Sequence, residues 1–264
     1  MHSITSREHT LFKQLVKLEK SSRQRRIAGL TLLDGAHLIQ AYQAAQGIPL
    51  KLIISELGCN NTEIKYLLGR FSKYVEVNTV MLSDALFRQV SPVKTPSGIL
   101  ALIAIPLSEP NTISDNQVFC VLLEAMQDPG NLGAILRSAA AAGVSDVYLS
   151  NDCADAWSPK TLRAAMGAHF SLTIHEQSNL TQVAQRFHGQ VIATTLHATR
   201  HLYQTDLTGP VAFVFGNEGA GLSPEMLQAV SEQVTIPMSG NTESLNVTAA
   251  AAICFFEKVR QQCY

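Results

Sequence analysis

The segment VFCVLLEAMQDPGNLGAILRSAAAAGV, from Val118 to Val144, identifies the fold class. It opens with an apolar run, residues 118–123, that has the length and character of a buried strand. Pro129 and Gly130 then predict a turn, and an Ala-rich helix is expected from about Asn131. A strand, a turn and a helix in this order are typical of an α/β protein with a parallel sheet.

The same alternation continues on both sides of this segment. Later apolar runs of strand length are SDVYLS (145–150), QVIATTL (190–196), VAFVFG (211–216) and EQVTIP (232–237). We therefore predict a parallel-sheet domain over residues 118–264. Earlier strand-like runs are TLLDGA (31–36), KLIISE (51–56), YVEVN (74–78) and GILALIAI (98–105), and helical stretches between them cover 37–46, 62–71 and 81–90. They predict a smaller α/β domain over 1–105, and the Pro- and Ser-containing residues 106–117 predict a linker.

Composition excludes several classes of protein. Of the 264 residues, 46% are apolar and 16% are charged, which excludes a disordered chain. No apolar run reaches the roughly 18 residues of a membrane span, and the N-terminus lacks a hydrophobic signal region. The five cysteines are scattered and form no CxxC pair. We expect a globular protein of the reducing cytoplasm that does not contact a membrane.

Charge is divided unevenly along the chain. Residues 1–110 hold 13 Lys and Arg against 8 Asp and Glu, a balance of +5, whereas residues 111–264 hold 7 against 13, a balance of −6. Much of the positive excess lies in the first 26 residues, and such a cluster favours a polyanion such as RNA. Arg23, Arg25 and Arg26 are the candidate RNA-binding residues. From charge alone, a solvated helix face is the alternative.

Three loops that directly follow predicted strands are candidate ligand sites, because open parallel sheets bind ligands beyond the carboxyl ends of their strands. In the first loop, Asn131 suits a helix N-cap. Arg137 is expected on the inner turns of that helix among apolar and Ala neighbours, where a guanidinium favours an anion such as phosphate or a carboxylate. An arginine that snorkels from the helix edge is an equal alternative.

The second loop, in FVFGNEGAGLSPEML (213–227), contains Gly216, Gly219 and Gly221. Three glycines this close allow backbone amides to approach a ligand. The spacing is GxxGxG, no Lys-Ser or Lys-Thr pair follows it, and Glu218 would repel a phosphate. A neutral or cationic ligand is therefore favoured, with an ordinary glycine-rich turn as the alternative.

The third loop leads from a strand expected at 233–236 through Pro237 into a long Ala-rich helix. Ser244 and Asn246 fall at the start of this helix. One of them is expected to cap the helix, and the other can orient a ligand together with the first-turn amides.

In this order and at these spacings, the loops resemble the three signature motifs of the SpoU (TrmH) family of RNA ribose 2'-O-methyltransferases, within the SPOUT class. The similar segments are NLGAILR (131–137), FGNEGAGLS (215–223) and IPMSGNTESLNVTAAAAI (236–253). SPKTLRAAMGA (158–168) resembles the family's segment between the first two motifs. Residues 1–105 look like the family's N-terminal RNA substrate-binding domain, a small α/β/α module.

The resemblance implies transfer of a methyl group from S-adenosylmethionine to a ribose 2'-hydroxyl in RNA, with ribosomal RNA favoured over transfer RNA. It also implies a trefoil knot in the C-terminal domain and a homodimer whose active sites draw on both subunits. Two departures from the family pattern are Thr248 in place of Ser and Asp34 in place of Glu. Both keep the hydroxyl or carboxylate chemistry.

By resemblance, the active site comprises Asn131, Arg137, Glu218, Ser244 and Asn246. The expected cofactor-binding residues are Thr194, Gly216, Asn217, Gly219, Ile236, Met238 and Leu245. Because a guanidinium stays protonated and is a poor base, we expect Arg137 to hold the neighbouring RNA phosphate and to stabilise the developing alkoxide. The proton acceptor is left open between that phosphate and a desolvated Arg137.

Other function classes fit less well. A nicotinamide-dependent enzyme needs GxGxxG, which DPGNLG does not supply. A noncatalytic RNA-binding protein would be expected to have lost Arg137, Asn246 or the glycine loop, and all are present. His197 and His201 are four residues apart, but HATRH lacks the Glu of a zincin, so no metal site is expected.

Overall fold

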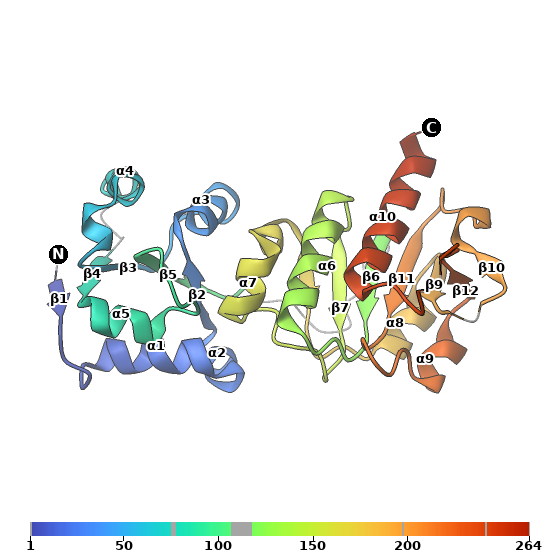
Figure 1. Cartoon of the computed structure of the whole chain (residues 1–264), viewed down its shortest axis with the longest axis horizontal. Coiled ribbons are helices and arrows are strands. Elements are labelled where there is room, and N and C mark those ends of the chain that lie inside the picture. Colours follow the sequence, from blue (N-terminus) through green and yellow to red (C-terminus); the bar gives the residue numbers. More distant parts are fainter. Residues whose placement is uncertain (1, 75–77, 107–117, 197, 241, 264) are drawn as a thin grey trace. The chain divides into compact units, whose positions relative to one another are not determined.

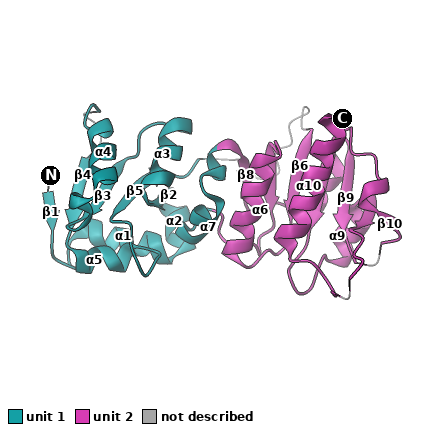
Figure 2. Ribbon diagram, turned by 45° about the horizontal axis from the view of Figure 1, so that its top comes forward, with its two compact units in different colours: residues 1–107, 157–170 teal, residues 108–156, 171–264 magenta. Residues whose placement is uncertain are grey.

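The chain folds into two compact units in the computed structural model (Figure 2). Unit 1 comprises Met1–Leu107 and Trp157–Phe170, and unit 2 comprises Ser108–Ala156 and Ser171–Tyr264. The structure describes residues 2–74, 78–106, 118–196, 198–240 and 242–263. Apart from Pro106, the linker expected at 106–117 lies outside the described residues.

Unit 1 contains a mixed five-stranded sheet in the order β1-β4-β3-β5-β2. The strands are β1 His2–Ile4, β2 Leu30–Asp34, β3 Lys51–Ser55, β4 Asn78–Leu82 and β5 Ile99–Ala104. β5 is antiparallel to β2 and β3, whereas β1, β4 and β3 are parallel. Alternate strand positions such as Ile53, Val80 and Leu100 face one core, since successive strand residues point to opposite sides of a sheet.

Helices cover this sheet. They are α1 Thr10–Lys20, α2 Ser22–Ala28, α3 Ala36–Ala45, α4 Thr62–Phe71 and α5 Asp84–Val90, with a 3-10 turn η1 Gly58–Asn60. α1 and α5 pack on the core face through Leu15 and Phe87. Residues 75–77 of the strand predicted at 74–78 lie outside the described residues, and β4 covers 78–82, where Val80 and Leu82 enter the core. The following helix accordingly begins at Asp84.

A segment from the second half of the chain completes unit 1. It contains α7 (Pro159–Ala165), which packs on β2, and most of a 3-10 turn, η2 (Ala168–Ser171). In Figure 2, α7 has the colour of unit 1. Thr31 Oγ1 donates to the carbonyl of Trp157 (2.6 Å), and Tyr42 meets Phe170 edge to face at 5.3 Å. These contacts explain why residues 157–170 depart from the single domain expected over 118–264.

Unit 2 contains a seven-stranded, wholly parallel sheet, as predicted, in the order β10-β12-β9-β11-β6-β7-β8. The strands are β6 Phe119–Leu123, β7 Asp146–Leu149, β8 Thr173–His175, β9 Gln190–Thr194, β10 Arg200–His201, β11 Val211–Phe215 and β12 Glu232–Thr235. The five predicted strands of this half correspond to β6, β7, β9, β11 and β12. β8 and β10 are short additions that the apolar pattern does not predict.

Both faces of this sheet are covered. The helices are α6 Pro129–Ala141, α8 Leu180–Arg186, α9 Pro224–Ala229 and α10 Val247–Cys263, with a 3-10 turn η3 Leu202–Gln204. α6 and α10 pack together (Figure 1), and Phe255 of α10 contacts Phe119 and Phe213. α8 and α9 pack with Leu122 and Val214, the alternate strand positions. The fully apolar run of β11 is explained by this burial on both faces.

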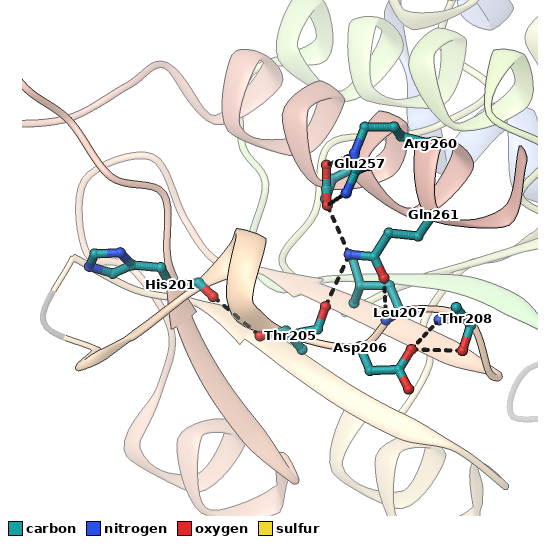
Figure 3. Close-up of polar contacts among 8 residues, drawn as sticks. All are labelled: His201, Thr205, Asp206, Leu207, Thr208, Glu257, Arg260 and Gln261. Atoms are coloured by element: carbon teal, nitrogen blue, oxygen red, sulfur yellow. Dashed lines mark hydrogen bonds and ion pairs between the residues drawn. The ribbon is translucent and has the colours of Figure 1, made fainter. Parts of the chain in front are cut away.

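The C-terminal half of α10 is fixed to the segment before β11 (Figure 3). Gln261 Nε2 donates to the carbonyl of Thr205 (3.0 Å), and the amide of Leu207 donates to Gln261 Oε1 (2.8 Å). The buried Lys258 Nζ donates to the carbonyls of Leu207 (2.8 Å) and Gly209 (2.7 Å), and burial lowers the pKa of this lysine. These bonds hold the C-terminal half of α10 against the segment that precedes β11.

All five cysteines are free thiols. Cys120 is fully buried in the core, and this burial raises the pKa of its thiol to about 12. Within the described part of the chain, no helix is long and apolar enough to cross a membrane.

Candidate cofactor and active site

A cavity of about 270 Å³ opens in unit 2 beyond the carboxyl ends of β9, β11 and β12. Strand ends and the loops after them supply its walls. The lining residues are Thr194, Thr195, Leu196, Phe215, Gly216, Asn217, Glu218, Gly219, Gly221, Leu222, Thr235, Ile236, Met238, Ser244, Leu245, Val247 and Ala250. The structure thus brings together all seven residues expected to bind the cofactor, with two of the five expected in the active site, Glu218 and Ser244.

The glycine-rich loop after β11 closes on itself. The amides of Asn217 and Gly221 donate to each other's carbonyls at 2.9 and 3.0 Å. Gly216 permits this closure, because a Cβ there would lie 2.3 Å from the backbone carbonyl of Gly221. Gly221 has a φ of 73°, a conformation that favours glycine. The loop therefore needs both glycines for its own shape, and its backbone then forms one wall of the cavity.

Asn217 ties this loop to the neighbouring strand. Its Oδ1 accepts from the amides of Gly219 and Ala220, both at 2.9 Å, and its Nδ2 donates to the carbonyl of Ala125 at 2.8 Å. Ala125, which follows β6, has a φ of 52°, an uncommon conformation for alanine. The loops after β6 and β11 are therefore held together on the same edge of the sheet.

Glu218 is the acidic group of the cavity. Its carboxylate accepts from Asn131 Nδ2 (3.0 Å) and from the amides of Asp128 (3.3 Å) and Gln127 (3.4 Å). Desolvation opposes ionisation, but the hydrogen bonds together lower the pKa of Glu218. Among the described residues, the cavity lining contains no Lys or Arg. An ionised carboxylate in an otherwise uncharged cavity favours a ligand with a positive charge.

Glu124 is a further polar residue at this edge of the sheet, and the sequence motifs do not single it out. It follows β6 directly, and its two carboxylate oxygens accept from the amide (2.8 Å) and the hydroxyl (2.7 Å) of Ser223. Ser223 also caps α9 by accepting from the amide of Met226 (3.1 Å). The signal that could have revealed Glu124 is its position, because an acidic residue directly after a buried strand lies at the ligand-binding edge of a parallel sheet.

Asn246 caps the last helix. Its Oδ1 accepts from the amide (2.8 Å) and the hydroxyl (2.5 Å) of Thr248. Of the two candidates at this helix start, Asn246 is therefore the capping residue, and Ser244 lies in the cavity lining. Thr248, which departs from the family pattern, uses the hydroxyl that it shares with serine.

The helix after β6 begins earlier than predicted. Asp128 is its N-cap, and the side chain accepts from the amides of Gly130 (2.6 Å) and Asn131 (2.9 Å). The prediction that Asn131 is the cap is wrong, because Pro129 favours the first helical position and leaves capping to the residue before it. Asn131 lies on the first turn instead, where its side-chain amide reaches Glu218.

Arg137 lies on the inner turns of α6, as expected, but its side chain is exposed. The buried face of this helix is formed by residues such as Leu132, Ile135 and Leu136. Arg137 does not line the cavity of its own chain. It makes no ion pair with any residue that the structure describes. Its guanidinium is therefore available to an external anion.

The three candidate RNA-binding arginines differ in exposure. Arg23 and Arg26 are exposed on α2. Arg25 is only 4% exposed, and its Nη1 donates to the carbonyls of Leu18 (2.5 Å) and Glu19 (3.0 Å) near the end of α1. These bonds satisfy carbonyls that a helix leaves free at its C-terminus. Arg25 is therefore a structural residue, which corrects its assignment as an RNA contact.

In the parts of the chain that the structure describes, no group of three or more His, Cys, Asp or Glu side chains could hold a metal ion. His197 lies outside the described residues. His201 ends β10 and is exposed.

Unit 2 has a cavity at the carboxyl edge of its parallel sheet, with the glycine-rich loop after β11 and the start of α10 in its walls. This arrangement is typical of a ligand-binding α/β enzyme domain. The family model described as the SpoU rRNA Methylase family matches residues 118–256. The chain belongs to this family, and the predicted family is confirmed.

Relatives and solved structures extend the similarity to both units. An "Uncharacterized tRNA/rRNA methyltransferase slr1673" of Synechocystis is 34% identical over 98% of this chain and 94% of its own length. The 23S rRNA (guanosine(2553)-2'-O)-methyltransferase RlmP of Bacillus subtilis is 30% identical over 97% of this chain and 98% of its own length. A crystal structure of an RNA 2'-O ribose methyltransferase matches with a TM-score of 0.82 and 31% identity over 99% and 100%. The structure of the SpoU methyltransferase AviRb of Streptomyces viridochromogenes, in complex with AdoMet, matches with a TM-score of 0.86 and 26% identity. The match covers 97% of this chain and 99% of that chain.

Proposed function

We propose that the protein transfers a methyl group from S-adenosylmethionine to a ribose 2'-hydroxyl of ribosomal RNA in the cytoplasm. The observation that carries this proposal is the cavity of unit 2, where the seven expected cofactor residues meet Glu218 and Ser244. Relatives named as 23S rRNA 2'-O-methyltransferases support ribosomal RNA as the substrate. Transfer RNA is the second candidate, since the name of the Synechocystis relative includes it.

The cavity fits the chemistry of this cofactor. Leu222, Ile236 and Leu245 provide an apolar wall suited to an adenine ring, and the glycine loop provides backbone polar groups beside it. Glu218 favours a cationic sulfonium because it stays ionised. When bound, the cofactor supplies an electrophilic methyl group, so the protein itself has to position the two reactants and exclude water.

The remaining residues act on the RNA side of the reaction. Asn131 fixes the carboxylate of Glu218, and Ser244 lines the cavity where the ribose would enter. Arg137 binds the phosphate beside the target ribose and stabilises negative charge as it develops on the 2'-oxygen. Because a guanidinium holds its proton, we assign Arg137 charge stabilisation rather than proton removal.

The exposed position of Arg137 favours a homodimer. Arg137 does not line the cavity of its own chain, so an active site that includes it requires a second copy. The family resemblance also leads us to propose a trefoil knot in unit 2. The insertion of β12 between β9 and β10, followed by the return of α10 to pack on α6, supports this topology.

Unit 1 is assigned to RNA binding. A groove along α1 and α2 is lined by Lys13, Lys17 and Gln24, and Arg23 and Arg26 are exposed on the same pair of helices. Basic side chains in this arrangement neutralise phosphates without reading sequence.

Two measurements test the proposed function. Calorimetry on the full chain should detect binding of S-adenosylmethionine and of its demethylated product. Mapping of 2'-O-methyl sites by primer extension in cells with and without the protein should reveal one lost site in ribosomal RNA. A lost site in transfer RNA would select the second candidate. Cofactor binding with no lost site in either RNA would contradict the proposed reaction.

A further inference from the structure

Unit 1 contains a cavity of about 230 Å³ that the proposed reaction does not use. It lies where β2 ends and α3 begins, and the loop before β5 and the end of α7 form its other walls. The residues that determine its chemistry are Asp34, His37, Leu38, Ser97, Arg163 and Met166. All of them belong to unit 1.

The carboxylate of Asp34 is the acceptor group of this cavity. Its Oδ1 accepts from the hydroxyl of Ser97 (2.9 Å), and its Oδ2 accepts from the hydroxyl of Ser91 (3.0 Å). Each carboxylate oxygen can accept two hydrogen bonds, so each has one acceptor position left. The serines hold the carboxylate in place, and two adjacent acceptor positions remain for a ligand.

Donor groups lie near the same carboxylate. Arg163 is exposed on α7, and its charge acts on Asp34, yet the two side chains form no ion pair. The N-cap of α3 is Gly35, which has no side chain to accept from the first-turn amides. A guanidinium beside an uncapped helix start suits a phosphate.

Leu38 and Met166 form the apolar part of the cavity wall, beside His37 and Thr95. Leu38 is buried, whereas Met166 is 47% exposed and has a φ of 52°, so its backbone is held in a left-handed conformation that non-glycine residues seldom adopt. A thioether packs well against a planar ring. The volume equals that of roughly eight water molecules at about 30 Å³ each, which is room for one ring system.

We propose that this cavity binds a guanine nucleotide of the RNA, with the base on Asp34 and a phosphate at Arg163. Guanine presents two adjacent donors, N1–H and the N2 amino group, which complement the two acceptor positions of the carboxylate. Adenine and cytosine present one donor next to an acceptor, and uracil presents one donor between two acceptors. Each of these bases would set an acceptor against a carboxylate oxygen. The inference rests on the proposed function, because it takes RNA as the source of the nucleotide.

The test is the nucleotide preference of the full chain with its cofactor cavity filled by S-adenosylhomocysteine. Saturation-transfer difference NMR titrations with GMP, AMP, CMP and UMP measure this preference, and fluorescence anisotropy with the RNA pentamers UUGUU and UUAUU extends it to a strand. GMP should bind about 10- to 100-fold more tightly than AMP, the range of a good bidentate contact. UUGUU should be preferred over UUAUU in the same direction.

Two variants and matched controls locate the contacts. Asp34→Asn exchanges one acceptor for a donor, so the preference for GMP over AMP should disappear, whereas Glu63→Gln, an exposed carboxyl of α4, should keep it. Arg163→Met should weaken the binding of GMP but not that of guanosine, which lacks the phosphate. Arg70→Met, at the end of α4, should change neither.

Equal binding of the four nucleotides to the wild-type chain would overturn the proposal, and this result does not depend on the folding of any variant. An Asp34→Asn protein that keeps the preference would also overturn it. A preference for GMP without one for UUGUU would overturn the RNA source and assign the cavity to a free nucleotide. Methyl transfer is measured on the same samples to distinguish a failure of this proposal from a failure of the proposed function. Absence of methyl transfer by the wild-type chain would contradict the proposed function, but it would not change the measured preference for guanine.

Discussion

Glu218, in the loop after β11 of unit 2, and Asp34, at the end of β2 in unit 1, are carboxyl groups whose pKa values their surroundings shift in opposite directions. Glu218 is exposed and accepts from three N–H groups, and its pKa is lowered. Asp34 is half-buried and accepts from two hydroxyls, and desolvation raises its pKa. Amide donors and exposure to water stabilise the charged form of a carboxylate. Burial with few hydrogen-bond donors disfavours that form, and donors from a ligand would stabilise it.

The two carboxylates are suited to different roles in the proposed function. The carboxylate of Glu218 in unit 2 has its hydrogen bonds supplied by the protein, and in the proposed function it offers a fixed negative charge to a cationic cofactor. The carboxylate of unit 1 keeps unused acceptor positions, which is the requirement for reading a base edge. We therefore expect substitutions in unit 2 to change catalysis and cofactor affinity, and substitutions in unit 1 to change RNA recognition.

The largest expected effect comes from one exposed arginine in each unit, Arg137 in unit 2 and Arg163 in unit 1. Arg137→Ala should lower the single-turnover methylation rate by about 100- to 1,000-fold, since the lost interaction strengthens in the transition state, and cofactor affinity should change little. Arg163→Ala should weaken RNA binding and leave the rate at saturating RNA nearly unchanged. Arg186→Ala, an exposed arginine of α8, is the control. Wild-type turnover by Arg137→Ala would remove this residue from the active site.

A smaller effect is expected from the glycine loop of unit 2. In Gly216→Ala the new Cβ would meet the carbonyl of Gly221 at 2.3 Å, so the loop must shift. We expect a loss of about 1–3 kcal/mol of stability, measured by denaturant unfolding, and weaker cofactor binding by calorimetry. Gly209→Ala is the matched control, because a Cβ there meets nothing within 4 Å and the residue is not part of the cavity lining. Unchanged cofactor affinity in Gly216→Ala would show that the loop does not shape the cofactor site.

In unit 1, substitutions of two neighbouring arginines should affect different properties, stability for Arg25 and RNA affinity for Arg23. Arg25→Ala leaves buried carbonyls of α1 without their donor and should cost about 1–3 kcal/mol of unfolding free energy. Arg23→Ala should change stability by less than about 0.5 kcal/mol. It should instead weaken RNA binding and reduce the slope of log affinity against log salt by about 1. Equal salt slopes for Arg23→Ala and wild type would remove α2 from the RNA interface.

The smallest effect is the pH dependence that the two carboxylates impose on folding. Because the folded-state pKa of Glu218 is lowered, its contribution is present above the unfolded pKa of about 4.3 and is lost as pH falls through the folded pKa. The raised pKa of Asp34 has the opposite sign, so its contribution is present below about pH 3.9 and is lost as pH rises through the folded pKa.

Thermal unfolding of two variants measures these signs. Relative to wild type, Glu218→Gln should be less stable at pH 7 than at pH 3, and Asp34→Asn should be less stable at pH 3 than at pH 7. The same pH trend in both variants would contradict the contrast between the two carboxylates.

The sequence predicts the edge of the sheet in unit 2 well, for a physical reason. Strands buried on both faces are apolar throughout, so the loops after β6, β11 and β12 can be located without a structure. Gly216 and Ser244 then fall into one cavity, because the ends of parallel strands meet at one edge. The cap of α6 could have been predicted too, since Asp128 directly precedes Pro129.

Other features depend on contacts that no local pattern encodes. Arg25 looks like its neighbours in a basic run, and only the packing of α2 against the end of α1 buries it. The transfer of residues 157–170 to unit 1 follows from contacts with β2, far away in the chain. The presence of Asp34 and Arg163 in one cavity results from that transfer, so the sequence alone does not predict it.

The most direct test of the central claim is transfer of tritiated methyl from S-adenosylmethionine to deproteinised ribosomal RNA by the purified chain, followed by alkaline hydrolysis. Alkaline cleavage needs a free 2'-hydroxyl, so methylation of the ribose leaves the label in an alkali-resistant dinucleotide. The account predicts label in that dinucleotide with the wild-type chain and its near absence with Arg137→Ala. Label recovered only in mononucleotides would indicate methylation of a base and would contradict the assignment of a ribose 2'-O-methyltransferase.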